Sequence, residues 1–180
     1  MNNIKISLGR NCNPRVHIKN KFNLSKNNGY KSCVFDLCIT SYESLCSILE
    51  NNFKNFFDDL KIISWNNAPG NRKLAGTGLT CITNKNGVIF NHEGACHSHL
   101  FAEGKNDDEF YTRNNFKEFK KRYTSRISNF RNYCKKSNEI TFIHNHEKFD
   151  ENLIRNIIIN NYGKKTIKFT SIYKKKNNGF

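Results

Sequence analysis

Short apolar runs alternate with amphipathic helical segments along the chain, and this alternation restricts the fold more than any other feature. Turn signals separate the segments, such as Asn86-Gly87 between two strand-like runs and Gly163 after a helical one. A chain of 180 residues has the size of one domain and can bury a core without disulfides or a structural metal. We therefore expect one α+β domain over residues 1–173, with an antiparallel or mixed sheet of about six strands packed with about four helices, and a basic, disordered tail at 174–180.

Hydrophobic periodicity and breaker residues place the individual elements. Strands are expected at residues 4–8, 32–37, 60–65, 79–83, 88–91, 139–145 and 166–173. Helices are expected at residues 13–22, 40–57, 114–136 and 151–161. Asn13-Pro14, the capping box from Thr40 to Glu43, and Asp150 are typical helix starts.

The composition excludes several classes of protein. No window approaches 18 consecutive apolar residues, and the first residues lack the apolar region of a signal peptide, so we expect neither a membrane partner nor secretion. The seven cysteines form no Cys-x-x-Cys pair and are expected to be reduced thiols. These features indicate an intracellular protein, located in the cytoplasm of the host or producing cell or in a virion.

Cys12 is the strongest candidate for a nucleophile. It follows the first strand and the Gly9 turn, at the amino end of the helix 13–22. There the helix macrodipole and unsatisfied backbone N–H groups stabilise a thiolate and lower the pKa of the thiol, and Arg10 and Arg15 act in the same direction. Such a thiol is suited to attack on a carbonyl carbon, and its own backbone N–H could stabilise an oxyanion. The competing interpretation is an inert, buried thiol.

A nucleophilic thiol needs a base, and His92 has the best position among the six histidines. It follows the second hairpin strand, where a rigid scaffold can hold an imidazole over a helix terminus. A third polar group would orient that ring. Asn145, at the end of the strand 139–145, has suitable chemistry and completes the chain order Cys, His, Asn. We therefore expect a catalytic group of Cys12, His92 and Asn145.

These residues resemble a poorly characterised family of papain-like cysteine peptidases found in bacteria and large DNA viruses. The resemblance rests on Ile6-Ser7-Leu8-Gly9-Arg10-Asn11-Cys12, Phe35-Asp36-Leu37, the Phe-rich segment 52–57, Gly87-Val88-Ile89-Phe90-Asn91-His92, the basic segment 119–127 and the strand 140–143. It covers most of residues 4–145 in the family's order, although Leu37 stands where the family has Trp. It implies a papain-like fold and a thiol hydrolase of peptidase or amidase type, acting on an unidentified peptide or amide and needing no cofactor.

A second group of side chains has the chemistry of zinc ligands. It comprises His92, Cys96, His97 and His99, with His144 and His146 further along the chain. The spacing matches no common zinc finger, and a domain of this size folds without zinc. We therefore predict no metal.

The net charge of +15 is concentrated at the two ends of the chain. On a helical wheel of the segment 113–136, one side of the apolar stripe carries Arg113, Lys117, Lys120, Lys121, Arg131 and Lys135. Such a face could bind nucleic-acid phosphates without sequence preference, although a solvated amphipathic helix and AT-rich coding produce the same pattern. The alternative function is therefore a nucleic-acid-binding protein of a virus or mobile element on a catalytically inactive papain-like fold.

Overall fold

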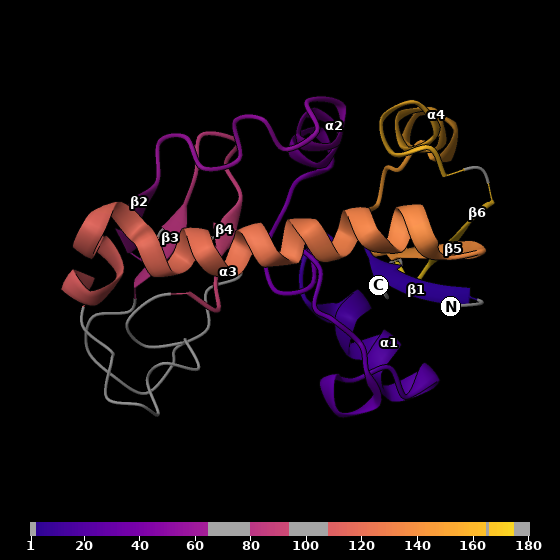
Figure 1. The fold of residues 1–180 in the computed structure, drawn as a ribbon. Helices are drawn as coiled ribbons and strands as arrows, with labels where there is room; N and C mark the ends of the chain where they lie inside the picture. Colours follow the sequence, from indigo (N-terminus) through magenta and orange to yellow (C-terminus); the bar gives the residue numbers. More distant parts are fainter. Residues whose placement is uncertain (1–2, 65–79, 94–107, 165, 175–180) are drawn as a thin grey trace, which may run out of the picture.

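Two separate three-stranded sheets make up the β-structure in the part of the chain that this computed structural model describes, namely residues 3–64, 80–93, 108–164 and 166–174. The parallel sheet has the order β1-β5-β6, and the antiparallel sheet has the order β2-β3-β4. In chain order, the elements are β1 (Asn3–Ser7), α1 (Asn13–Phe22), a short 3-10 helix (Lys26–Asn28), α2 (Tyr42–Glu50), β2 (Lys61–Ser64), β3 (Thr80–Thr83), β4 (Ile89–Phe90), α3 (Asp108–Lys136), β5 (Glu139–His144), α4 (Glu151–Tyr162) and β6 (Ile167–Ser171). Figure 1 shows the two sheets toward opposite ends of the long helix α3.

Helices α1 and α4 form where the cap and breaker residues predict them. Pro14 lies in the first turn of α1, where its missing N–H costs no hydrogen bond. The side chain of Asp150 accepts the backbone N–H groups of Asn152 and Leu153 in the first turn of α4, at 2.9 and 3.0 Å, and Gly163 ends that helix with a φ of 67°. The predicted bounds 13–22 and 151–161 are therefore confirmed, the second to within one residue.

One hydrophobic core joins the two sheets. Helix α3 buries a stripe of aromatic side chains, and its Tyr123 contacts Phe90 of β4 edge to face with ring centroids 4.7 Å apart. Two helical turns further along α3, Phe130 stacks on Phe142 of β5, with the ring centroids 6.2 Å apart. Each aromatic side chain buries a large apolar area, so α3 holds both sheets against a single core.

The pairing of the strands differs from the single sheet that the sequence predicted. The central strand β5 pairs with β1 on one edge and β6 on the other, and no described strand connects this sheet to β2-β3-β4. The expected strand at residues 32–37 is also wrong, because this segment consists mainly of turns. The carboxylate of Asp36 accepts the backbone N–H of Cys33 at 2.7 Å, and this local hydrogen bond takes the place of strand pairing.

Helix α2 is shorter than the predicted helix 40–57. It begins after Ser41, whose hydroxyl accepts a backbone N–H of the first turn at 3.1 Å, so the cap lies one residue beyond the predicted position. It ends at Glu50, and the chain then turns through Asn52 and Phe53, which have φ angles of 48° and 62°. The predicted residues 51–57 therefore belong to turns and not to the helix.

The ends and the surface of the fold add two further findings. None of the helices in the described ranges is both long enough and apolar enough to cross a membrane. Of the predicted tail at 174–180, the structure describes Lys174, which is exposed, and the remaining residues lie outside the described part of the chain.

Candidate active site

A tight turn between β1 and α1 places Cys12 at the amino end of the helix. Gly9 donates its backbone N–H to the hydroxyl of Ser7 at 3.2 Å, and that hydroxyl donates to the carbonyl of Phe35 at 3.3 Å. A Cβ atom on Gly9 would lie 2.5 Å from Cγ of Pro14, so the chain needs a glycine here to pass the proline ring. Cys12 is consequently the cap residue that immediately precedes α1, as the sequence predicted.

Asparagine side chains fix the conformation of this turn. The Asn145 amide accepts the backbone N–H of Arg10 at 2.8 Å and donates to Oδ1 of Asn11 at 2.8 Å. The same Oδ1 accepts the backbone N–H of Asn13 at 2.9 Å. Asn145 therefore lies against the segment that precedes Cys12, and its expected role as the residue that orients His92 remains a prediction.

The thiol of Cys12 lies beside the imidazole of His92. Sγ and Nε2 are 3.2 Å apart, although the two residues are 80 positions apart in the sequence. Both side chains are half-buried. Asn91 is also close to the thiol, with its two amide atoms 3.8 and 3.9 Å from Sγ. The structure thus brings together two of the three residues that the sequence selected, and adds a third that the sequence analysis did not select for this role.

Glu93 anchors the segment that carries the imidazole. Its side chain is fully buried, and its carboxylate lies 2.5 Å from Nη2 of Arg122 and 3.8 Å from Nη2 of Arg126, both on α3. Its backbone N–H donates to the carbonyl of Phe90 at 2.9 Å, and its carbonyl accepts the N–H of Ile82 at 3.0 Å. The sequence analysis missed this residue, although two arginines four positions apart on α3 offered it a matching pair of charges.

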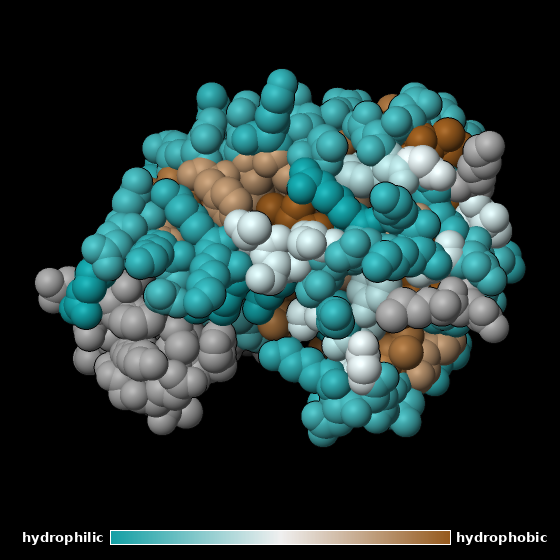
Figure 2. Space-filling view, viewed as in Figure 1, coloured by the Kyte–Doolittle hydropathy of each residue, from teal (hydrophilic) through white to brown (hydrophobic). Residues whose placement is uncertain are grey.

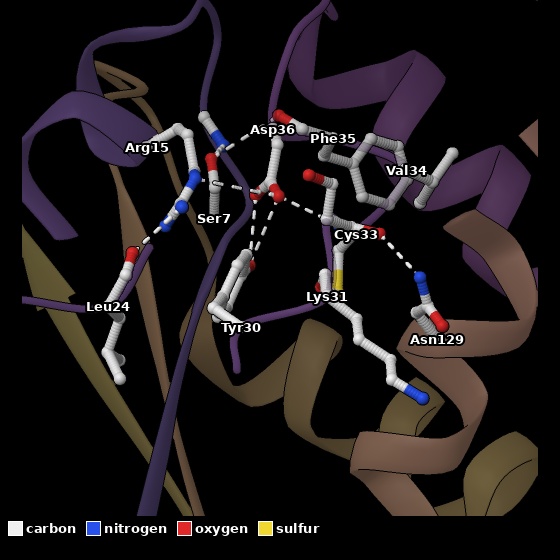
Figure 3. A network of polar contacts seen from close by, with 12 residues as sticks. Ser7, Arg15, Leu24, Tyr30, Lys31, Cys33, Val34, Phe35, Asp36 and Asn129 are labelled. Atoms are coloured by element: carbon white, nitrogen blue, oxygen red, sulfur yellow. Dashed lines mark hydrogen bonds and ion pairs between the residues drawn. The ribbon is translucent and has the colours of Figure 1, made fainter. Parts of the chain in front are cut away.

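A second buried carboxylate holds α1 against the neighbouring turn. Asp36 accepts hydrogen bonds from the backbone N–H of Cys33 and from the hydroxyl of Tyr30, at 2.7 and 3.1 Å, and Nε of Arg15 lies 3.8 Å away (Figure 3). Burial raises the pKa of Asp36 to about 6, although the charge of Arg15 opposes that shift. Arg15 comes from the first helix turn after Cys12 and also lies over the Tyr30 ring, 4.0 Å from its centroid. The Phe35-Asp36-Leu37 segment therefore supports the position of α1.

His144 and His146, which flank Asn145 in the sequence, form a buried pair. The ring of His144 stacks on Phe149 with centroids 3.7 Å apart, and Nε2 of His146 lies 3.0 Å from the carbonyl oxygen of Leu8. Burial lowers the pKa of each histidine to about 4, so both imidazoles are neutral at pH 7. The described residues contain no cluster of metal-ligand side chains. Three members of the possible zinc-ligand group, Cys96, His97 and His99, lie outside the described residues.

Acid should destabilise the fold through these two histidines. In the unfolded chain their pKa returns to about 6.5, so their contribution to stability is complete above about pH 6.5 and is lost as the pH falls toward 4. Asp36 has the opposite effect, because its raised pKa stabilises the folded protein as the pH falls over the same range. It is one group against two histidines, so it offsets only part of their loss. We expect the free energy of unfolding, measured with urea, to fall by about 1–2 kcal/mol between pH 7 and pH 5. The His144→Phe variant should lose less, and equal stability of the unmodified protein at both pH values would contradict the prediction.

The predicted basic face of α3 is interrupted. The backbone is non-helical from Arg113 to Phe116, so Arg113 does not continue the face of the regular helix that follows. The guanidinium of Arg131 donates to the carbonyl and the side-chain oxygen of Asn52 at 2.8 and 3.0 Å. Lys120 is half-buried, whereas Lys117, Lys121 and Lys135 are exposed. Figure 2 shows a mostly hydrophilic surface along α3, as expected for the outer face of an amphipathic helix.

One protein family matches nearly the whole chain. The family model described as "Putative papain-like cysteine peptidase (DUF1796)" matches residues 3–172. No curated protein and no solved structure matches the chain. The match extends from β1 through β6 and therefore includes the Cys12 turn, the segment with His92 and the strand before Asn145.

Proposed function

The chain belongs to the family of papain-like cysteine peptidases, and within that family we propose that it is a thiol hydrolase of the peptidase or amidase type. Cys12 is the nucleophile and His92 is the general base. The observation that carries the proposal is the distance of 3.2 Å between Sγ and Nε2, at the amino end of α1. A nucleophile and a base must lie within hydrogen-bond reach of each other, which is about 2.6–3.2 Å in a working site.

The surroundings of the pair favour a thiolate. The thiol lies at the amino end of a ten-residue helix, where the positive end of the macrodipole stabilises negative charge. The imidazole provides a second stabilising group when it carries the thiol proton. Burial raises the pKa of five other thiols, namely Cys33, Cys38, Cys46, Cys81 and Cys134. Among the cysteines that the structure describes, Cys12 is thus the one with the surroundings of a nucleophile.

The reaction has two steps. In the first, His92 takes the thiol proton, Sγ attacks the carbonyl carbon, and the amide C–N bond breaks as His92 gives the proton to the leaving amine. A thioester on Cys12 remains. In the second, His92 takes a proton from water, the water oxygen attacks the thioester carbonyl, and the C–S bond breaks to release the carboxylic acid and restore the thiol.

Alkylation by iodoacetamide tests the activation of the thiol. Cys46 is the matched control, because it is half-buried like Cys12 but lies within α2, where burial raises its pKa. With labelling measured peptide by peptide between about pH 5 and pH 9, Cys12 should react at least about tenfold faster than Cys46 near pH 6. His92→Gln should remove most of this difference. Equal rates for Cys12 and Cys46 would overturn the proposal.

Hydrolysis of fluorogenic peptide amides tests the reaction itself. Cys12→Ala should lower the rate by about a thousandfold or more, because the covalent step is lost. Cys46→Ser should leave the rate unchanged. If Cys12→Ala hydrolyses the substrate at the rate of the unmodified protein, the activity belongs to another group or to a contaminant.

Two observations weaken the nucleic-acid alternative. Its basic face is broken between Arg113 and Phe116, and Arg131 is bonded to Asn52. The family match concerns a cysteine peptidase and names no nucleic acid. We therefore propose the thiol hydrolase alone.

A further inference from the structure

We propose that the side-chain amide of Asn91 is the hydrogen-bond donor that stabilises the oxyanion formed during attack by Cys12. This inference rests on the thiol chemistry proposed above. It adds a third catalytic residue, from the same short segment that carries the base.

The position of Asn91 is fixed from both sides. It follows β4, whose Phe90 is fully buried against the aromatic stripe of α3. It precedes His92 and then Glu93, whose buried carboxylate is bonded to Arg122. Asn91 and His92 therefore share one rigid backbone support, and a donor on such a support is preorganised for a charge that develops beside Sγ.

The distances suit an oxyanion better than the resting thiol. The amide atoms of Asn91 lie 3.8 and 3.9 Å from Sγ, which is long for a hydrogen bond to sulfur and makes the ground-state contact weak. When Sγ attacks a carbonyl, the oxygen that becomes negative is separated from Sγ by a single carbon atom. An amide nitrogen at this distance from Sγ is therefore in position to approach that oxygen at about 2.7–3.1 Å, the range of an oxyanion donor.

The amide acts only while charge is present on the oxygen. As Sγ bonds to the carbonyl carbon, the π-electron pair of the C=O bond moves to the oxygen, and the Asn91 N–H donates to it. When the amine leaves, the electron pair returns and the C=O bond re-forms in the thioester. An interaction that is weak in the ground state and strong in the transition state raises the rate of the chemical step and leaves substrate binding unchanged.

Two reactions of the same thiol separate this role from a merely structural one. Alkylation by iodoacetamide is a displacement at a saturated carbon and forms no oxyanion. Acylation by p-nitrophenyl acetate passes through a tetrahedral oxyanion. Both modifications are followed at the Cys12 peptide by mass spectrometry, in the full-length protein. The variant Asn91→Leu keeps the side chain branched at Cγ and removes its donor, and Asn152→Ala on the exposed surface of α4 is the control.

We expect Asn91→Leu to lower the acylation rate of Cys12 by about a hundredfold to a thousandfold, and to change its alkylation rate by less than about threefold. Asn152→Ala should change neither rate. With an amide substrate that the enzyme cleaves, Asn91→Leu should lower kcat while KM stays constant.

Three outcomes would overturn the inference. If acylation and alkylation fall together, Asn91 activates or positions the thiol and does not stabilise the oxyanion. If neither falls, Asn91 has no part in the reaction. If Cys12 of the unmodified protein reacts no faster than Cys46 with either reagent, the thiol chemistry itself fails, and this result is distinct from the other two.

Discussion

Replacing Glu93 with glutamine should destabilise the protein by about 3–5 kcal/mol, because it leaves buried positive charge without its partner. The carboxylate is fully buried and lies between Arg122 and Arg126, which are themselves largely buried. A neutral amide cannot compensate two guanidinium groups that are largely shielded from water. Urea unfolding at pH 7 measures the loss. Glu118→Gln is the control, since Glu118 is exposed on the same helix and its replacement should cost less than about 0.5 kcal/mol.

The same substitution should also reduce the reactivity of Cys12. Glu93 follows His92 directly, so a shift of the Glu93 backbone moves the imidazole away from Sγ. If Glu93→Gln does not fold, Glu93→Asp provides the test, because the shorter carboxylate keeps the charge and withdraws it from Arg122. Its Cys12 alkylation rate should fall toward that of Cys46. Unchanged stability in Glu93→Gln would show that the ion pair does not support the fold. Unchanged alkylation of Cys12 in a folded Glu93 variant would show that the ion pair does not position His92.

Local sequence signals predicted the parts of this fold that local interactions determine. Pro14 fixes the start of α1, and Asp150 and Gly163 fix the two ends of α4, so both helices lie where they were expected. The hairpin of β3 and β4 likewise follows from Gly87, which has a φ of 71°. These signals also placed Cys12 at the amino end of a helix, which is the basis of the chemistry that we propose for it.

The choice of strand partners could not be read from the sequence. Nothing in the apolar pattern of β5 indicates that both its neighbours are parallel strands from opposite ends of the chain. The pairing with β1 depends on contacts between residues more than 100 positions apart, such as Ile6 with Phe142. The single antiparallel or mixed sheet was therefore the simplest interpretation of the strand order. The described residues do contain six strands, but these form two sheets.

Buried polar groups account for the other differences. Asp36 turns the chain where an apolar run predicted a strand, because its carboxylate satisfies a backbone N–H locally. Glu93 was overlooked because a charged residue beside a histidine is typical of an exposed loop, and only its pairing with α3 reveals that it is buried. Asn145 was selected for its side-chain chemistry, whereas the contacts of its amide with Arg10 and Asn11 depend on the arrangement of β1 beside β5.

Gly9→Ala should distort the Cys12 turn and cost about 1–3 kcal/mol of stability, as an overpacked buried site does. The added Cβ would lie 2.5 Å from Cγ and 2.7 Å from Cδ of Pro14, and 2.6 Å from the carbonyl oxygen of Asn11. A proline ring and a backbone carbonyl cannot rotate away, so the turn itself must move. A displacement of about 1 Å in a catalytic group can lower a rate by about a hundredfold. We therefore expect Cys12 to lose most of its advantage over Cys46 in iodoacetamide labelling.

Gly163→Ala separates this local effect from a general loss of stability. Gly163 has a φ of 67°, so alanine is strained there, but no atom lies within 4 Å of the added Cβ. This variant should lose about 1 kcal/mol of stability and keep the full reactivity of Cys12. The next residue, Lys164, is bonded to the carbonyls of Ser137 and Asn138 before β5, whereas the Cys12 turn lies beside Asn145 after β5. The double variant Gly9→Ala with Pro14→Ala removes the contacts of the added Cβ with the proline ring but keeps the contact with the Asn11 carbonyl. The reactivity of Cys12 should therefore return only in part. Normal labelling of Cys12 in Gly9→Ala would mean that the close approach of Gly9 to Pro14 does not determine where the thiol lies.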